Sequence, residues 1–346
     1  MPPPALIMQT TYAELVERSA SGAFNDAFPK HGSFISKTIK GRRYWYFQKT
    51  SDEGRQQKYV GLETPELLSR IARYRQMRDD ERERRALVST LIRSFGLPRP
   101  IPEIGNILAA LANAGIFRLR GVLIGTVAYH TYSAMLGVRL PISTLQTGDV
   151  DIAQFTSISG AVDDQTPPVL DVLKNADKTF RSVPHAHGEA DVTTYIAKGG
   201  IRVDFLTPNV GPDTDAPRPL PSFQTDAEPL RFLDFLIHDP EPAVVLHNAG
   251  IYVLVPAPQR YAVHKLIVSR RRREGETKRD KDIRQASSLL HVMAEKRPQE
   301  LRAAWGEAYS RGKTWRLLLR EGLAQLPSAI RDATLKVVDE NSSGAR

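Results

Sequence analysis

The run Gly148-Asp149-Val150-Asp151-Ile152 restricts the fold more than any other part of this chain of 346 residues. Acidic and aliphatic residues alternate in it, which is the pattern of a strand with one buried face. Because successive side chains of a strand point to opposite faces, Asp149 and Asp151 stand side by side on the same face. Two carboxylates that close together repel each other unless a cation lies between them. The run therefore predicts either a site for a hard divalent metal ion or an exposed edge strand with two surface acids.

A second strand with an acid is predicted at Ile201-Arg202-Val203-Asp204-Phe205-Leu206. Asp204 is the only acid in this otherwise apolar run. It either forms an ion pair with Arg202 or, if the two strands are neighbours, completes a triad of carboxylates with Asp149 and Asp151.

The segment Leu123-Ile124-Gly125-Thr126 predicts a strand that passes through a glycine turn into a helix. The free N–H groups and the dipole of a helix N-terminus attract anions, so this turn could cradle a phosphate. The same residues also fit a plain tight turn.

Helical and strand patterns alternate through residues 103–250, which predicts an α/β (α+β) domain with a mixed sheet. We expect helices at 104–114, 126–136 and 169–176, strands at 119–124, 149–153, 232–236 and 251–255, and a hairpin from 191–197 and 200–206. Six of the 24 prolines lie in residues 207–229, which we expect to be a loop.

The flanks predict further parts. Residues 1–63 predict a short helix and a small β-sheet of three strands, which either covers a neighbouring core or forms a platform for nucleic acid or another partner. Residues 64–100 predict a long connecting helix that starts at Thr64-Pro65. The core with the mixed sheet would then span 101–257, and a helical C-terminal domain would span 258–346.

Taken together, Gly125-Thr126, Asp149-Val150-Asp151 and Val203-Asp204-Phe205 resemble the signature of the nucleotidyltransferase superfamily of the DNA polymerase β type. The chain looks like a bacterial family of nucleotidyltransferase-fold proteins related to AbiEii-type abortive-infection toxins. The resemblance covers roughly residues 103–295, including the runs at 260–266 and 281–286. Two features depart from the pattern: Thr126 stands where serine or glycine is usual, and the gap from Gly125 to Asp149 is long.

The resemblance implies an enzyme that transfers NMP from an NTP to a hydroxyl acceptor. Asp149, Asp151 and Asp204 would be the catalytic residues and would hold Mg²⁺ or Mn²⁺. Gly125, Thr126 and Lys265 would bind the nucleotide. The acceptor would be RNA of a tRNA-like kind or a protein, and a role as a toxin or defence protein is expected. The alternative is a non-catalytic nucleic-acid-binding or regulatory protein with the same fold.

Charge is segregated along the chain. Residues 1–100 carry a net charge of +7, residues 101–250 carry −7, and residues 251–346 carry +9. The pattern is either ordinary surface variation or a pair of basic flanks that grip a polyanion. On the second interpretation, the cluster Arg270, Arg271, Arg272 and Arg273 would contact the phosphate backbone of an RNA acceptor.

The absence of cysteine excludes disulfide frameworks, thiolate zinc sites and cysteine nucleophiles. The first residues show no signal-peptide pattern, and no apolar run is long enough for a membrane span. We therefore expect a cytoplasmic protein with no membrane partner. The sequence does not predict the oligomeric state.

Overall fold

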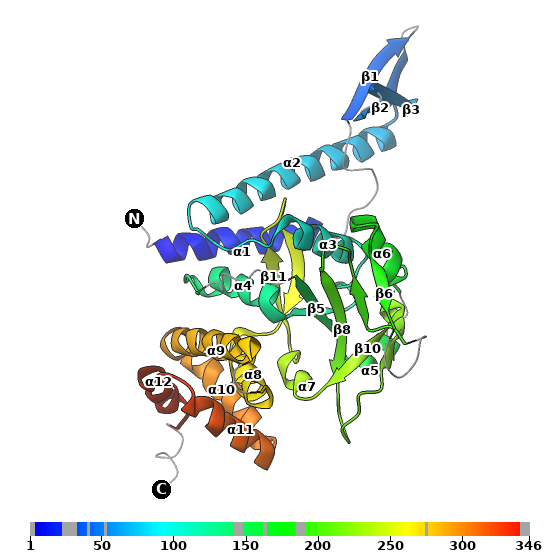
Figure 1. Ribbon diagram of the computed structural model, residues 1–346. Helices are drawn as coiled ribbons and strands as arrows, with labels where there is room; N and C mark the ends of the chain where they lie inside the picture. Colours follow the sequence, from blue (N-terminus) through cyan, green and yellow to red (C-terminus); the bar gives the residue numbers. More distant parts are fainter. Residues whose placement is uncertain are drawn as a thin grey trace.

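The computed structural model describes residues 4–22, 33–39, 42–51, 54–141, 148–161, 165–184, 191–273 and 276–339. A small sheet on a long helix projects from a body that is built from a central sheet and a group of C-terminal helices (Figure 1). The predicted mixed sheet, helical C-terminal region and small N-terminal sheet are confirmed. The division of the chain into four domains at the expected boundaries stays a prediction.

The N-terminal part consists of helix α1 (Pro4–Gly22), strands β1 (Ser33–Ile39), β2 (Arg42–Ser51) and β3 (Gly54–Leu62), and helix α2 (Pro65–Arg93). The strands form an antiparallel sheet in the order β1-β2-β3. Thr64 caps α2 because its hydroxyl accepts a hydrogen bond from the N–H of Leu67.

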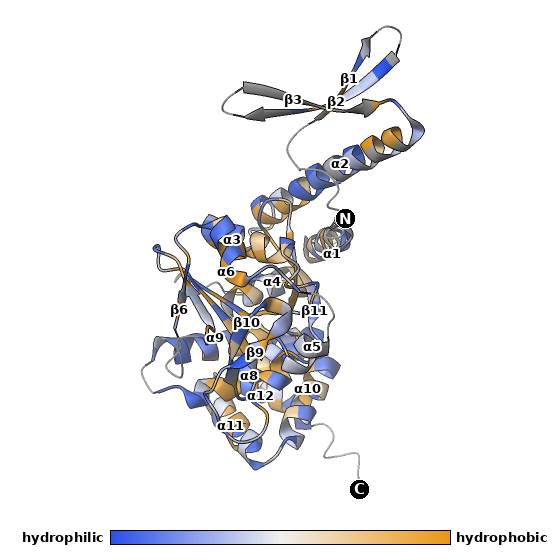
Figure 2. Cartoon of the chain, turned by 90° about the vertical axis from the view of Figure 1, so that its right-hand side faces the viewer, coloured by the Kyte–Doolittle hydropathy of each residue, from blue (hydrophilic) through white to orange (hydrophobic). Residues whose placement is uncertain are grey.

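Helix α2 is apolar near both ends and charged between them (Figure 2). Near its start, Leu67, Ile71 and Tyr74 pack against the small sheet. Near its end, Val88 and Leu91 pack against α1 and the body. The helix therefore connects two separate hydrophobic clusters, and neither of them is the main core.

The central sheet has the order β4-β5-β8-β10-β9, with β7 beside β8 and β6 beside β7. Strands β5 and β8 are parallel, as are β8 and β10, while β4 and β9 run antiparallel to their neighbours. The strands are β4 (Val122–Ile124), β5 (Asp149–Ala153), β6 (Arg181–Val183), β7 (Thr194–Ile196), β8 (Arg202–Pro208), β9 (Arg218–Leu220) and β10 (Thr225–Leu230).

Short helices and a separate hairpin surround this sheet. The helices are α3 (Pro102–Asn113), α4 (Gly125–Leu136), α5 (Thr156–Ala161), α6 (Val169–Ala176), the 3₁₀ turn η1 (Pro221–Phe223) and α7 (Leu233–Leu236), and the hairpin pairs β11 (Glu241–Val245) with β12 (Ile251–Val255). Tyr12 of α1 fixes this hairpin, because its buried hydroxyl donates to the carbonyl of Val244 and accepts from the N–H of Val244.

The C-terminal helices lie on the side of the body opposite α2 (Figure 1). They are α8 (Pro258–Arg271), α9 (Thr277–Lys296), α10 (Pro298–Ser310), α11 (Lys313–Ala324) and α12 (Ser328–Asp339). Their apolar side chains join those of the central sheet in one hydrophobic cluster that contains Val150 and Phe205 as well as Leu266 and Leu289. A shared core holds α8 and α9 in place beside the sheet.

Two expected elements are wrong. Residues 232–236 are not a strand: Phe232 has a φ of 67°, in the left-handed region, and α7 follows it. A short apolar run does not distinguish a strand from a helix by periodicity. Residues 207–229 are not one loop, because β9 and most of β10 lie there. Proline is tolerated in β9 because it is an edge strand.

Within the part of the chain that the structure describes, no helix is long and apolar enough to cross a membrane.

Candidate active site

The acids of β5 and β8 lie on one face of the sheet. Val150 and Ile152 point the other way and are fully buried. The parallel register pairs Asp151 with Asp204 and Asp149 with Arg202. Neighbouring strands lie about 4.8 Å apart, so the paired side chains are adjacent. The predicted adjacency of the two acid-bearing strands is thus present, and Arg202 lies among the three acids.

Asp151 is the most strongly perturbed of these acids. Burial, followed by the nearby charges of Asp204 and Asp149, raises its pKa to about 6. Lys265 and Lys278 act in the opposite direction but do not offset these effects. An additional cation close to Asp151 would stabilise its charged form and lower its pKa.

Asp204 is held by two polar neighbours. The Nε of Arg202 donates to both carboxylate oxygens, at 2.8 and 2.7 Å. The hydroxyl of Thr194 on β7 donates to one of them at 2.6 Å. Only 14% of the Asp204 side chain is exposed, against 48% of Arg202. The ion pair that was one of the two interpretations of this strand is therefore formed, although Asp204 also lies beside Asp151.

Gly125 occupies a position that other residues would not fit. It is the first residue of α4 and follows β4 directly, with a φ of 72°. A Cβ atom there would lie 2.3 Å from Oδ2 of Asp151. Glycine is thus required both by the backbone and by the close approach of the acid. Thr126 is the second residue of α4, and the free N–H groups of this helix start beside Asp151 can bind an anion.

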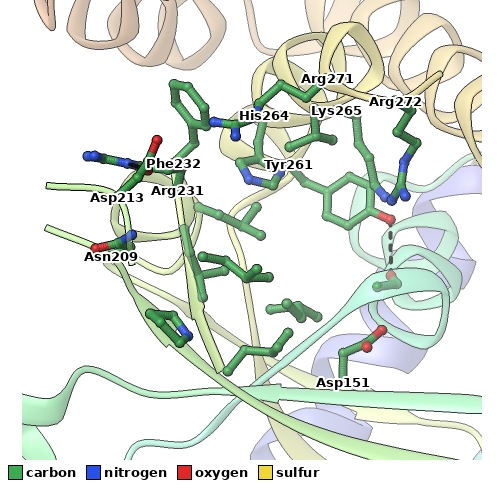
Figure 3. Close-up of a pocket in the computed structure, with 18 of the residues that line it drawn as sticks. Asp151, Asn209, Asp213, Arg231, Phe232, Tyr261, His264, Lys265, Arg271 and Arg272 are labelled. Atoms are coloured by element: carbon green, nitrogen blue, oxygen red, sulfur yellow. Dashed lines mark hydrogen bonds and ion pairs between the residues drawn. The ribbon is translucent and has the colours of Figure 1, made fainter. Parts of the chain in front are cut away.

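A cavity of about 670 Å³ lies beside Asp151. Asp151 lies at one end of it (Figure 3), and Gly125, which packs against Asp151, also lines it. Across the cavity from Asp151 are Lys265 and Arg272, which come from α8 and the residue after it. The far end is formed by polar and aromatic side chains of the segments around β10, namely Asn209, Asp213, Arg231 and Phe232.

A buried acid fixes the two cations on the cavity wall. Asp282 of α9 has a side chain only 3% exposed, with Nζ of Lys265 at 2.5 Å and Nε of Arg272 at 2.6 Å. Burial alone would raise the pKa of Asp282, but Lys265 and Arg272 hold it below its ordinary value. One carboxylate thus balances two cations, which leaves a net positive charge on this wall.

Two further side chains of α8 line the cavity. The Tyr261 hydroxyl lies 3.0 Å from the carbonyl oxygen of Gly125 and 3.0 Å from Oε1 of Gln285, so it can donate to either. Burial raises its pKa well above the ordinary value, so it stays protonated. His264 is buried, and burial followed by the charge of Lys265 lowers its pKa to about 3, so it is neutral.

The four predicted acceptor arginines do not share one surface. Arg270 contacts Glu321 of α11 and Arg272 contacts Asp282. The Arg271 guanidinium lies over the ring of Phe232, 5.5 Å from its centre, and Arg273 is exposed. The structure therefore places Arg271 and Arg272 on the cavity wall rather than on a separate basic face.

Of the residues predicted for the site, the cavity brings together Gly125, Asp151, Lys265, Arg271 and Arg272. Sequence reasoning gave no role to Tyr261, His264, Asp282, Asn209 or Phe232. A signal existed for Tyr261, because it stands at helical spacing from Lys265, which was predicted for the site. Asp282 lies in the run 281–286 that carries part of the resemblance, but its role depends on packing between α8 and α9, which the sequence does not show.

The three acids form a donor set of the kind that a divalent cation takes. Asp149, Asp151 and Asp204 provide carboxylate oxygens on one face, and burial followed by the charges of the other two acids raises the pKa of Asp151. Carboxylate oxygens are the ligands that a hard divalent cation takes. In the described residues, no three His, Cys, Asp or Glu side chains are grouped closely enough to hold a metal ion as they stand. Both oxygens of Asp204 accept from Arg202 in this arrangement, and the donor chemistry itself fits a divalent cation.

We expect Gly125→Ala to lower the free energy of unfolding by about 1–3 kcal/mol, because alanine is strained at this φ and its Cβ meets Asp151. Gly160→Ala in α5 is the matched control, since a Cβ there meets nothing within 4 Å. Chemical denaturation of both variants measures the difference. Equal effects would contradict the close packing of Gly125 against Asp151.

The pKa of Asp151 predicts a pH dependence of stability. Between about pH 4 and 6 the folded protein binds a proton there that the unfolded chain has lost, so the free energy of unfolding falls as the pH rises. Asp151→Asn removes this loss and should be more stable than the wild type above pH 6, by up to about 3 kcal/mol. Denaturant titrations from pH 4 to 8 without divalent cations measure it, with the exposed Asp171→Asn as control. Parallel pH profiles for wild type and Asp151→Asn would refute the prediction.

Arg202 competes with any cation that binds the acids. Arg202→Gln should therefore bind Mn²⁺ about two- to fivefold more tightly than the wild type, as expected for the loss of a half-exposed ion pair. Calorimetric titration with Mn²⁺ measures the dissociation constant, and the exposed Arg181→Gln serves as control. Unchanged or weaker binding by Arg202→Gln would show that Arg202 does not oppose the metal.

Comparison with known proteins places the chain in a family. A search of curated proteins finds no match. Among solved structures, one described as an antigenic nucleotidyltransferase-like protein from Paracoccidioides brasiliensis is 14% identical, covers 67% of this chain and 98% of its own, and has a TM-score of 0.29, which is too low to support an argument about the site. A family model described as nucleotidyltransferase matches residues 102–310, more than half of the chain. The protein therefore belongs to this nucleotidyltransferase family.

Proposed function

We propose that the protein transfers an NMP group from an NTP to a hydroxyl group of RNA, with the cavity as the nucleotide site. The observation that carries this proposal is the meeting of three features on one cavity: the acid Asp151, the glycine turn at Gly125 and the cations Lys265 and Arg272. Acids beside a phosphate-binding turn are of little use to a protein that only binds polyanions. They suit a reaction in which cations accompany the phosphates.

The triphosphate would lie between α4 and α8. Gly125, the first residue of α4, lines the cavity end on one side, and Thr126 follows it in the helix. Lys265 and Arg272 face the cavity end from the other side, already positioned by Asp282. This arrangement supplies hydrogen-bond donors and positive charge to the phosphate oxygens without a large movement of side chains.

Asp149, Asp151 and Asp204 would hold the divalent cations, Mg²⁺ or Mn²⁺. When bound, the cations would neutralise phosphate charge and make the acceptor hydroxyl more acidic. Asp204 is the candidate general base for that hydroxyl, and Thr194 and Arg202 orient its carboxylate. Arg202 must release at least one oxygen of Asp204 before that oxygen can serve as a ligand or a base.

The rest of the cavity fits a nucleoside. Beyond the phosphate end, its wall is largely apolar, with Leu206, Leu230 and Leu236. The far end offers the aromatic ring of Phe232 and the amide of Asn209. An apolar slot with a few polar groups at its end is a typical site for a planar base.

The relation to AbiEii-type toxins and the cytoplasmic location stay predictions.

The proposal is tested by incubating the protein with each of the four NTPs, labelled on the α-phosphate, together with Mg²⁺ and either total RNA or cell lysate. We expect label to appear in RNA, and none when the label is on the γ-phosphate. Asp149→Asn should keep the fold and lose at least about 100-fold in rate, more than the loss of an outer-shell contact at a metal site. Asp171→Asn, on the surface, should transfer as the wild type does.

The other outcomes are equally informative. Label in a protein band would replace RNA by a protein acceptor. Label from the γ-phosphate would indicate phosphoryl rather than nucleotidyl transfer. No transfer with any NTP, while the protein still binds RNA, would favour the non-catalytic alternative.

A further inference from the structure

The small N-terminal sheet lies outside the part of the chain that the family explains. The family match begins at residue 102, whereas the sheet occupies 33–62. Figure 1 shows the sheet at the end of α2, away from the body. Its role must therefore be sought in its own surface.

The two faces of this sheet differ in what they contact. Phe34, Trp45 and Phe47 belong to the hydrophobic cluster formed with the first turns of α2. The rings of Phe34 and Phe47 meet Tyr74 of α2 edge to face. One face of the sheet is therefore occupied by the helix.

By the alternation of side chains along a strand, Lys37, Tyr44 and Tyr46 lie on the opposite face. Lys37 and Tyr44 are register partners on adjacent strands. The Lys37 ammonium lies over the ring of Tyr46, 4.9 Å from its centre. Lys37 is exposed and both tyrosines are partly exposed. This face thus offers two aromatic rings beside a cation.

The charge of the segment indicates what would bind there. Residues 33–62 contain seven Lys and Arg and only two Asp and Glu. Such an excess attracts a polyanion, and phosphate contacts from lysine and arginine supply most of the affinity for nucleic acid. Aromatic side chains on the same surface stack on unpaired bases, which a duplex keeps inside its helix.

We propose that the face of the sheet with Lys37, Tyr44 and Tyr46 binds single-stranded RNA. We further infer that this RNA is the acceptor of the transfer reaction, and this part rests on the proposed function. The proposal that the sheet binds RNA does not depend on it. The sheet thus provides a binding site separate from the nucleotide cavity, at the far end of α2 from the body.

The test uses the full-length protein and a fluorescent single-stranded RNA of about 20 nucleotides with a blocked 3′ end, so that binding is measured without transfer. Tyr44→Thr/Tyr46→Thr removes both rings and keeps residues that favour strands. By fluorescence anisotropy, this variant should bind at least about tenfold more weakly, since each stacked base contributes about 1–3 kcal/mol. Lys37→Gln should reduce the slope of log affinity against log salt by about 0.7.

Controls separate binding from folding. Tyr44→Phe/Tyr46→Phe keeps the rings and should bind as the wild type does, whereas a general disturbance of the sheet would not be rescued in this way. Arg331→Gln/Lys336→Gln removes two positive charges from α12, at the opposite end of the molecule, and should leave the affinity unchanged.

Three results would overturn the inference: a threonine variant that binds like the wild type, a duplex of the same sequence that binds as tightly as the single strand, or polyglutamate that competes as well as RNA.

The transfer assay distinguishes a failure of this inference from a failure of the proposed function. Loss of RNA binding in the threonine variant supports the sheet as a binding site even if no NTP is used. Unchanged RNA binding refutes it even if transfer occurs.

Discussion

The parallel pairing of β5 with β8 is the constraint on which the site depends. It places Asp151 next to Asp204 and leaves Arg202 beside Asp149. The antiparallel neighbour β4 then delivers Gly125 against Asp151, so the glycine turn and the acids meet because of strand order alone. A shift of β8 by one residue would turn Asp204 to the opposite face and Val203 to the acids, and would break both the site and the core.

Charge balance divides the site into two halves. On the acid side, Arg202 pairs with Asp204, while burial and then the charges of Asp204 and Asp149 raise the pKa of Asp151. On the cavity wall opposite, one carboxylate serves two cations, and Asp282 has a lowered pKa. The acid side lacks positive charge and the wall lacks negative charge. Metal ions and a triphosphate, bound together, would correct both deficits, and neither would do so alone.

Local patterns were enough to find the acids and the turn. Alternation of apolar and acidic residues marked Asp149 and Asp151, and a glycine between a strand and a helix marked Gly125. The same kind of reasoning failed at 232–236, where five residues are too few to show a period and the left-handed Phe232 starts α7. It also missed Asp282, because its partners Lys265 and Arg272 are 17 and 10 residues away and meet it only when α8 packs on α9. The four arginines at 270–273 form one cluster in sequence, yet α8 ends at Arg271 and the backbone is extended at Arg272, so the side chains reach different partners.

Helix α2 joins the small sheet to the body without a glycine or an internal proline in its 29 residues. Its middle is supported by ion pairs one turn apart, such as Arg84 with Asp80 and Arg85 with Glu81. In a continuous helix, each added residue both lengthens the helix and rotates one end relative to the other. Adding seven residues to that middle would move the sheet outward by about 10 Å and nearly restore its orientation, whereas adding two would turn its tyrosine face by about 200°. The length of this segment therefore sets the direction in which the sheet faces, and evolution could adjust its reach freely only in steps of whole turns.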